Sequence, residues 1–256
     1  MVITTPDKDM PSLPNNDRSW ALFLDLDGTL VELVDHPDNI AVDDALRMRL
    51  ETLTTLLDGA VAVISGRAID DLDKHLTLPT LAMSGQHGAE WRDSQGNRHI
   101  ARAHQKALEA VRQQVRAHVD RDDALYLEDK GASLALHYRH RPEAGDILNR
   151  ELTALIDKYP EVLELHQGKF VFEIKGRGYD KGVALERFLA TPPFTDRCPV
   201  FIGDDRTDED GFRTVNAHQG LAIKVGTGES IAGSRLTDPE AVHEWLDQWI
   251  TLLQRS

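Results

Sequence analysis

The chain has 256 residues, of which 41% are hydrophobic, and it carries a formal net charge of −14 at pH 7. This length and composition are sufficient for one large domain or two modest ones, each with a real core. The negative charge argues against nucleic acid or an anionic membrane as a partner. No stretch approaches the ~20 consecutive apolar residues that a membrane helix needs.

The amino-terminal segment, residues 1–18, lacks the basic start and the apolar block of a signal peptide. We expect a disordered tail there. A single cysteine, Cys198, excludes an intramolecular disulfide and fits a reducing compartment. The sequence therefore predicts a cytoplasmic protein, which we expect to be a monomer. We expect Cys198 to pack at the start of an apolar strand and to have no catalytic role.

The apolar run at 20–24 is followed by Asp25-Leu26-Asp27-Gly28-Thr29. This pattern is typical of a buried strand that ends at the carboxyl edge of a parallel sheet, where open α/β sheets place their chemistry. Two Asp residues separated by one residue raise each other's pKa unless a cation shares them. Their oxygens are hard ligands that suit Mg²⁺. The alternative is a strand that runs into an ordinary acidic turn.

A second strand is predicted next in the chain. Asp43 can cap a helix with leucines on one face, and the apolar run at 60–64 then ends in Ser65-Gly66-Arg67 before another helix at 68–76. This β-α-β unit makes the two strands parallel neighbours, so Ser65 emerges at the same edge as Asp25. The alternative is a strand-to-helix turn in which Ser65 serves only as a cap.

The pattern changes within residues 103–177. Helical spacing of apolar residues predicts helices at 104–119 and 143–159, and strict alternation predicts strands at 133–139 and 169–175. The helices would cover the apolar side of an antiparallel sheet, leaving its other side charged and open. That side is either a solvated surface or a lid that faces the carboxylates. Its polar residues are Glu128, Lys130, Arg139, Lys169 and Glu173.

The core pattern resumes at Asp180, which can cap a helix that has Lys181 in its first turn. The helix dipole mildly opposes a cation there, so a role in surface stability explains Lys181 poorly. The apolar run at 199–202 leads into five acids within residues 204–210. Such a turn would be strange unless it bound a cation. A further strand and an apolar helix that ends at 253 complete a doubly wound sheet.

The chain resembles the haloacid dehalogenase superfamily of phosphotransferases, because four elements occur in that superfamily's motif order: Asp25/Asp27, Ser65, Lys181 and Asp204/Asp208. The longer strings ISGR, HGAE, ALHYR, QGKFVFEIK and GDDRTDED resemble the trehalose-phosphatase family within it. The resemblance implies an α/β fold with a doubly wound, Rossmann-like parallel core at 19–102 and 178–256. It also implies an inserted α+β cap of type IIB-like form at 103–177, which would set substrate specificity.

The family's activity is Mg²⁺-dependent hydrolysis of trehalose 6-phosphate through an aspartyl-phosphate. By resemblance, Asp25 is the nucleophile and Asp27 the general acid and base. Asp25, the Asp27 carbonyl and Asp204 would bind Mg²⁺ directly. Asp205 and Asp208 would not bind the metal ion but would contact its ligands.

Ser65 and Lys181 would complete the phosphoryl cradle, with Gly66 and Arg67 beside the substrate. Arg67 either supports this cradle or pairs with a nearby acid. The substrate-binding set would also contain the five polar residues of the cap. Another sugar-phosphate phosphatase, for sucrose or hexose phosphate, and a phosphohexomutase of the same fold are the alternatives. A non-enzymatic sugar-phosphate sensor is disfavoured, because both catalytic acids are intact.

Overall fold

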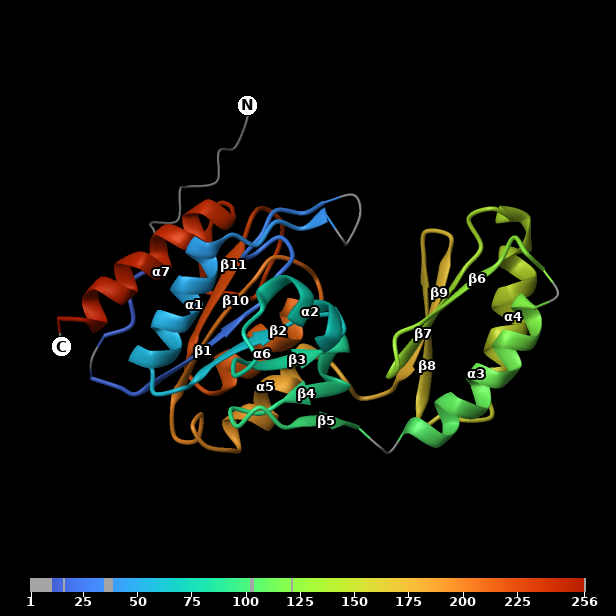
Figure 1. Cartoon of the computed structure of the whole chain (residues 1–256), viewed down its shortest axis with the longest axis horizontal. Coiled ribbons are helices and arrows are strands. Elements are labelled where there is room, and N and C mark those ends of the chain that lie inside the picture. The colour runs from blue at the N-terminus through green and yellow to red at the C-terminus, as the bar shows by residue number, and fades with distance from the viewer. Residues whose placement is uncertain (1–10, 16, 35–38, 102–103, 121, 256) are drawn as a thin grey trace, which may run out of the picture. The chain divides into compact units, whose positions relative to one another are not determined.

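The computed structural model describes residues 11–15, 17–34, 39–101, 104–120 and 122–255. The chain divides into two compact units (Figure 1): unit 1 contains residues 1–99 and 180–256, and unit 2 contains residues 100–179. The inserted unit begins three residues before the expected position 103 and ends two residues after 177. No helix within the described ranges is long and apolar enough to cross a membrane.

Unit 1 is built on an eight-stranded sheet with the order β12-β11-β10-β1-β2-β3-β4-β5. The strands from β12 to β3 pair in parallel, and β4 pairs antiparallel to β3. The predicted parallel sheet, with the Asp25 strand at its centre, is confirmed. The strand bounds are β1 Trp20–Leu24, β2 Val61–Ile64, β3 Ala82–Gly85, β4 Glu90–Arg92, β5 Arg98–Ile100, β10 Cys198–Gly203, β11 Leu221–Val225 and β12 Ser234–Leu236.

Helices cover both faces of this sheet. Leu22 and Leu24 of β1 belong to a core shared with α1, α2 and α7, whereas Ala21 and Phe23 belong to a second core shared with α5 and α6. This split follows from the alternation of side chains along a strand, and it makes the sheet doubly wound, as predicted. The helix bounds are α1 Asp44–Leu56, α2 Ile69–Leu76, α5 Lys181–Leu189, α6 Asp208–Ala217 and α7 Pro239–Leu253.

Carboxylate caps fix where three of these helices begin. The side chains of Asp43, Asp180 and Asp238 accept hydrogen bonds from backbone amides at 2.7, 2.8 and 2.9 Å respectively. A cap of this kind contributes about 1 kcal/mol. The cap at Asp180 also bears on function, because Lys181 is the first residue of α5.

The amino-terminal segment packs on unit 1 over part of its length. Pro11 and Pro14 are buried, and the Pro11 carbonyl accepts a hydrogen bond from Trp245 Nε1 at 2.9 Å. The Asn15 carbonyl accepts one from Trp20 Nε1 at 2.6 Å. We expected a disordered tail at residues 1–18, but Pro11 and Asn15 are hydrogen-bonded to the rest of unit 1. The expected tail therefore extends too far toward the carboxyl end. Residues 1–10 and 16 lie outside the described ranges.

Unit 2 is a four-stranded antiparallel sheet with the order β6-β7-β9-β8. Its core packs the apolar sides of two helices against the apolar side of the sheet, as predicted. Strand β8 was not predicted, because its sequence LELHQG is mostly polar, as suits a strand at the sheet edge. The bounds are β6 Tyr126–Asp129, β7 Ser133–His137, β8 Leu163–Gly168, β9 Val171–Gly176, α3 Gln105–Val119 and α4 Gly145–Ile156.

Candidate active site

The carboxyl ends of β1 and β10 bring the acids of unit 1 together. Leu24 pairs with Ile202 in the parallel ladder, and the Asp25 amide extends it by donating to the Ile202 carbonyl at 3.0 Å. Asp25 therefore lies one residue beyond its strand, and Asp204 lies one residue beyond Gly203, where β10 ends. This is the edge at which the sequence predicts the chemistry.

A buried lysine links two of these acids. Lys181 Nζ lies 2.8 Å from Asp25 Oδ1 and 2.6 Å from Asp208 Oδ1, and the exposed fractions of the three side chains are 3, 6 and 0%. The Asp180 cap sets the start of α5 and so places Lys181 in its first turn. These ion pairs explain a cation at a helix start that the helix dipole disfavours.

Asp208 and Asp205 hold the loop that follows β10. Asp208 Oδ2 accepts hydrogen bonds from the amides of Asp204 and Asp205, both at 2.9 Å. Asp205 Oδ1 accepts from the Thr207 amide at 2.8 Å and the Asp208 amide at 3.2 Å, where α6 begins. The side chains of Asp205 and Asp208 therefore fix the backbone of this turn from Asp204 to the start of α6.

The acidic edge, by which we mean the carboxylates of Asp25, Asp204 and Asp208, fits a divalent cation. Asp25, Asp204 and Asp208 each offer a carboxylate oxygen, and these oxygens lie within 4.8 Å of one another. A Cβ at Gly28 would lie 2.2 Å from Asp204 Oδ2, so only glycine leaves room for that carboxylate. Hard oxygens in such a group suit Mg²⁺. Both Asp208 oxygens already accept hydrogen bonds, which leaves Asp25 and Asp204 as the better side-chain ligands.

Burial makes these carboxylates hard to ionise without a cation. Desolvation raises the pKa of Asp25 to about 6, although Lys181 acts in the opposite direction. Burial and the charges of Asp208 and Asp205 raise the pKa of Asp204 to about 6. Burial and the charge of Asp25 raise the pKa of Asp208 to about 7. Desolvation acts to lower the Lys181 pKa, but the charges of Asp25 and Asp208 outweigh it and raise that pKa.

Arg67 pairs with the second acid of the DLDGT motif. Its Nε and Nη2 donate to the two carboxylate oxygens of Asp27, both at 2.7 Å, and its Nη1 donates to Asp71 Oδ2 at 2.6 Å. Of the two roles expected for Arg67, pairing with a nearby acid is the one that the geometry shows. Both oxygens of the Asp27 carboxylate are therefore engaged by Arg67.

Ser65 lies buried at the end of β2, and its Oγ accepts a hydrogen bond from the Arg67 amide at 3.1 Å. A Cβ at Gly66 would lie 2.7 Å from the His87 imidazole, so this glycine lets the ring approach the β2–α2 turn. The His87 amide donates to the Ser65 carbonyl at 3.1 Å. Gln86 and His87 have φ values of +48° and +54°, a strained pair of the kind found near functional sites. Sequence analysis did not place His87 beside Ser65.

On the polar face of the unit 2 sheet, three of the five expected residues come together. Glu128 and Glu173 both pair with Ala135 across the sheet, and Lys130 Nζ lies 3.9 Å from a carboxylate oxygen of each. His137 Nε2, which the sequence analysis missed, lies 3.0 Å from Glu128 Oε2. The signal was its position on the same face of the alternating strand.

Arg139 and Lys169 do not join this cluster. Strand β7 ends at His137, and Arg139 lies exposed in the turn that follows. Lys169 and Phe170 form the two-residue connection between β8 and β9, with Phe170 at φ +60°. The predicted alternation is wrong for Arg139 and Lys169, because β7 ends before Arg139 and β9 begins after Lys169.

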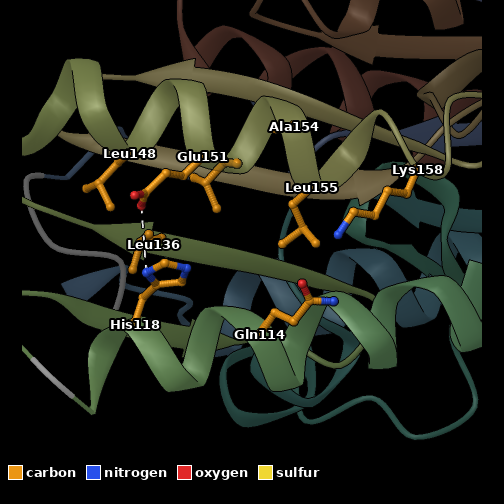
Figure 2. A pocket seen from close by; sticks show the side chains of 9 residues that line it. Gln114, His118, Leu136, Leu148, Glu151, Ala154, Leu155 and Lys158 are labelled. Atoms are coloured by element: carbon orange, nitrogen blue, oxygen red, sulfur yellow. Dashed lines mark ion pairs between the residues drawn. The ribbon is translucent and has the colours of Figure 1, made fainter.

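Unit 2 also has a hollow between α3 and α4, on the helical side of its sheet (Figure 2). Its floor is apolar, and His118 Nδ1 lies 3.7 Å from Glu151 Oε2 at its rim. None of the site residues predicted from the sequence lines this hollow.

The parallel sheet of unit 1 with the inserted antiparallel sheet of unit 2 is a fold of the haloacid-dehalogenase-like class. A haloacid dehalogenase-like hydrolase from Bacteroides thetaiotaomicron has the same fold, with a TM-score of 0.65 at 14% identity over 90% of this chain and 99% of that one. A second structure, described as a trehalose-6-phosphate phosphatase related protein, has a TM-score of 0.74 at 24% identity. The match covers 92% of this chain and 100% of that one.

Within this class, the trehalose-phosphatase family model matches residues 23–240. The chain is also similar to the trehalose-6-phosphate phosphatase of Escherichia coli (strain K12), with 40% identity over 242 residues, which cover 94% of this chain and 91% of that protein. The chain belongs to the trehalose-phosphatase family, a family of phosphoric monoester hydrolases.

Proposed function

We propose that the protein hydrolyses trehalose 6-phosphate to trehalose and phosphate with Mg²⁺ as cofactor. The observation that carries the proposal is the buried Lys181, which lies between Asp25 and Asp208 with Asp204 beside them. A protein that only bound an anionic ester would gain nothing from burying two carboxylates, those of Asp25 and Asp208, against the Lys181 ammonium. The E. coli relative, named for the same substrate, supports the choice of sugar.

Asp25 would act as the nucleophile. One of its carboxylate oxygens attacks phosphorus in line, the bond from phosphorus to the sugar oxygen breaks, and an aspartyl-phosphate forms. Asp27 gives a proton to the departing sugar oxygen. Asp27 then takes a proton from a water molecule that attacks the same phosphorus, which releases phosphate and restores Asp25. Both Asp27 oxygens accept a hydrogen bond from Arg67, and each keeps a second lone pair through which Asp27 would carry the proton.

The other groups would position the phosphoryl group. Mg²⁺ held by Asp25, Asp204 and the Asp27 carbonyl would neutralise charge between an anionic nucleophile and an anionic ester. Asp205 and Asp208 would keep the Asp204 loop in place through the amides that they accept from. Ser65 Oγ and Lys181 Nζ would donate to phosphoryl oxygens, and Gly66 would let the chain pass close beside them.

The sugar would be recognised by unit 2. Every candidate ester carries the same phosphate, so discrimination needs groups that reach sugar hydroxyls. Glu128, Lys130 and Glu173 combine two acceptors with a donor on one polar sheet face, and they are our proposed sugar-binding residues. His137 would orient Glu128 through their 3.0 Å contact.

We place the enzyme in the cytoplasm as a monomer. The single cysteine supports a reducing compartment, since the chain uses no disulfide. Size-exclusion chromatography with light scattering tests the monomer directly. A stable dimer would contradict this part of the proposal and leave the chemistry untouched.

Phosphate release over a panel of trehalose, sucrose, glucose and mannose phosphates tests the function. We expect trehalose 6-phosphate to give the highest kcat/KM and activity to vanish on chelation and return with Mg²⁺. Faster hydrolysis of a monosaccharide phosphate would contradict the substrate. Transfer of the phosphoryl group between sugar hydroxyls without phosphate release would indicate a mutase instead.

A further inference from the structure

Strand β11 carries a buried lysine at a position where the sheet pattern predicts an apolar residue. Ala222 packs with α5 and α6, and Ile223 and Val225 pack in the opposite core. Because side chains alternate along a strand, Lys224 lies on the same sheet face as Ala222. It is only 6% exposed. Burying an ammonium costs free energy unless its donors are satisfied. A lysine at this position therefore has a purpose other than filling the core.

The Lys224 ammonium joins the ends of two strands. The β10–β11 ladder ends where Gly203 pairs with Lys224. Beyond that pair, Lys224 Nζ donates to the carbonyl of Asp204 and to the carbonyl of Val225, the second at 2.8 Å. The side chain thus replaces the backbone hydrogen bonds that stop when the Asp204 loop leaves the sheet.

Asp204 is consequently held on both sides. Its carbonyl accepts from Lys224, and its amide donates to Asp208 Oδ2 at 2.9 Å. Its carboxylate points instead at the space that Gly28 leaves, beside Asp25. Two fixed peptide groups leave the Asp204 side chain few directions, which is how a ligand is prepared for a metal ion.

Lys224 also adds positive charge where carboxylates accumulate. Lys181 forms ion pairs with Asp25 and Asp208, whereas Asp204, the third acid of the group, has no ion pair with it among the described residues. The Lys224 ammonium is hydrogen-bonded to the Asp204 carbonyl, so its positive charge lies beside this third acid. A neutral donor could have satisfied the two carbonyls, but it would have supplied no charge.

We propose that Lys224 is a positioning residue for the divalent cation, which fixes the Asp204 backbone and supplies a second buried positive charge to the acidic edge. This inference rests on the metal dependence of the proposed function. The competing explanation is structural: Lys224 joins two strands and supports the fold only. Metal affinity separates the two, because support of the fold alone changes stability and leaves the affinity for Mg²⁺ as it was.

The test compares Lys224→Met with Arg92→Met. Arg92 is a matched control, because it too is a buried cation that donates to two carbonyls, those of Leu81 and Leu78, but it lies on β4. Mg²⁺ is titrated into each protein in a calorimeter without substrate, and its effect on Tm is followed. Loss of a group that orients a metal ligand typically weakens binding by about 10- to 100-fold. We expect such a loss for Lys224→Met and an unchanged Kd for Arg92→Met, although both melt earlier.

Lys224→Met and wild type with equal Mg²⁺ affinities would overturn the inference. Absence of Mg²⁺ binding by the wild type would instead overturn the metal dependence of the proposed function. If Lys224→Met gives no cooperative melting transition, Lys224→Gln and Lys224→Arg replace it. Weaker Mg²⁺ binding by the Gln variant, with recovery in the Arg variant, supports the inference, and wild-type affinity in the Gln variant contradicts it.

Discussion

Arg67 meets Asp27 through two parallel hydrogen bonds of 2.7 Å, so the proposed general acid and base has both carboxylate oxygens on one guanidinium. Such a fork fixes orientation as well as charge. Lysine cannot reproduce it, because an ammonium is a point charge without the planar pair of donors. The pairing therefore predicts that Arg67 acts on catalysis through Asp27.

Asp27→Asn should slow release of the sugar most in the first turnover. Proton donation contributes about 10²–10⁴-fold where the leaving group is a poor one. We expect a loss in that range with trehalose 6-phosphate and a smaller loss with p-nitrophenyl phosphate, measured by rapid quench. Arg67→Lys should show the same leaving-group dependence to a lesser degree. Equal losses on the two substrates would mean that Asp27 does not protonate the leaving group.

Removing Lys181 should destabilise the protein, because Asp25 and Asp208 would stay buried without their cation. Breaking a buried ion pair costs about 3–5 kcal/mol. We expect Lys181→Met to lower the free energy of unfolding by that order in urea at pH 8. The loss should shrink at pH 5.5, because Asp25 and Asp208, with pKa values of about 6 and 7, then take up protons. A loss that is the same at both pH values would argue against this charge network.

Stabilisation by Mg²⁺ should grow with pH. In the metal-free protein the pKa values of Asp25 and Asp204 are raised to about 6 and that of Asp208 to about 7. The folded state therefore holds protons more tightly than the unfolded chain, and their contribution to stability is lost as pH rises from about 4 through 7. Mg²⁺ competes with these protons.

The Tm shift at fixed Mg²⁺ concentration should accordingly be small at pH 5.5 and largest near pH 8. Differential scanning fluorimetry over this pH range measures it, with Asp204→Ala as the control that should show little shift at any pH. A shift that stayed constant from pH 5.5 to 8 would place the metal away from these carboxylates.

Substitutions on the polar face of the unit 2 sheet should weaken recognition of the sugar and leave the phosphoryl chemistry unchanged. We expect Lys130→Ala and Glu173→Ala to lower kcat/KM for trehalose 6-phosphate. Each loss should correspond to about 1–3 kcal/mol of transition-state stabilisation. The same changes should leave p-nitrophenyl phosphate hydrolysis nearly unchanged. Lys169→Ala is the matched control, since this exposed lysine lies in the β8–β9 connection outside the cluster. Losses shared by both substrates would exclude sugar recognition by this face.

The sequence predicted the acidic edge because strand ends in a parallel sheet obey a simple rule. An apolar run that ends in acid or serine places that residue at the carboxyl edge, so Asp25, Ser65 and Asp204 needed no knowledge of packing. The pairing of Arg67 with Asp27 depends on side-chain directions across two strands. Spacing along the chain does not contain that information, which is why two roles for Arg67 stayed open.

Edges and turns were harder to predict. The polar sequence of β8 gives little periodic signal, because an edge strand has one neighbour and much exposure. Arg139 and Lys169 fit the alternation in sequence, but Arg139 lies in the turn after β7 and Lys169 in the turn before β9. Lys224 was visible as a charge within the apolar strand LAIKV, yet its partner carbonyls belong to a loop that only the fold brings near.

Identification of the phosphorylated residue tests the proposed chemistry most directly. Asp27→Asn slows attack by water on the aspartyl-phosphate, and p-nitrophenyl phosphate needs little proton donation to form it. We therefore expect this variant, mixed with p-nitrophenyl phosphate and Mg²⁺ and quenched in acid, to carry phosphate on Asp25. The same experiment with Asp25→Asn should leave the protein unmodified. Phosphate on another residue, or first-turnover release of nitrophenol by Asp25→Asn at a rate within about tenfold of wild type, would contradict Asp25 as the nucleophile.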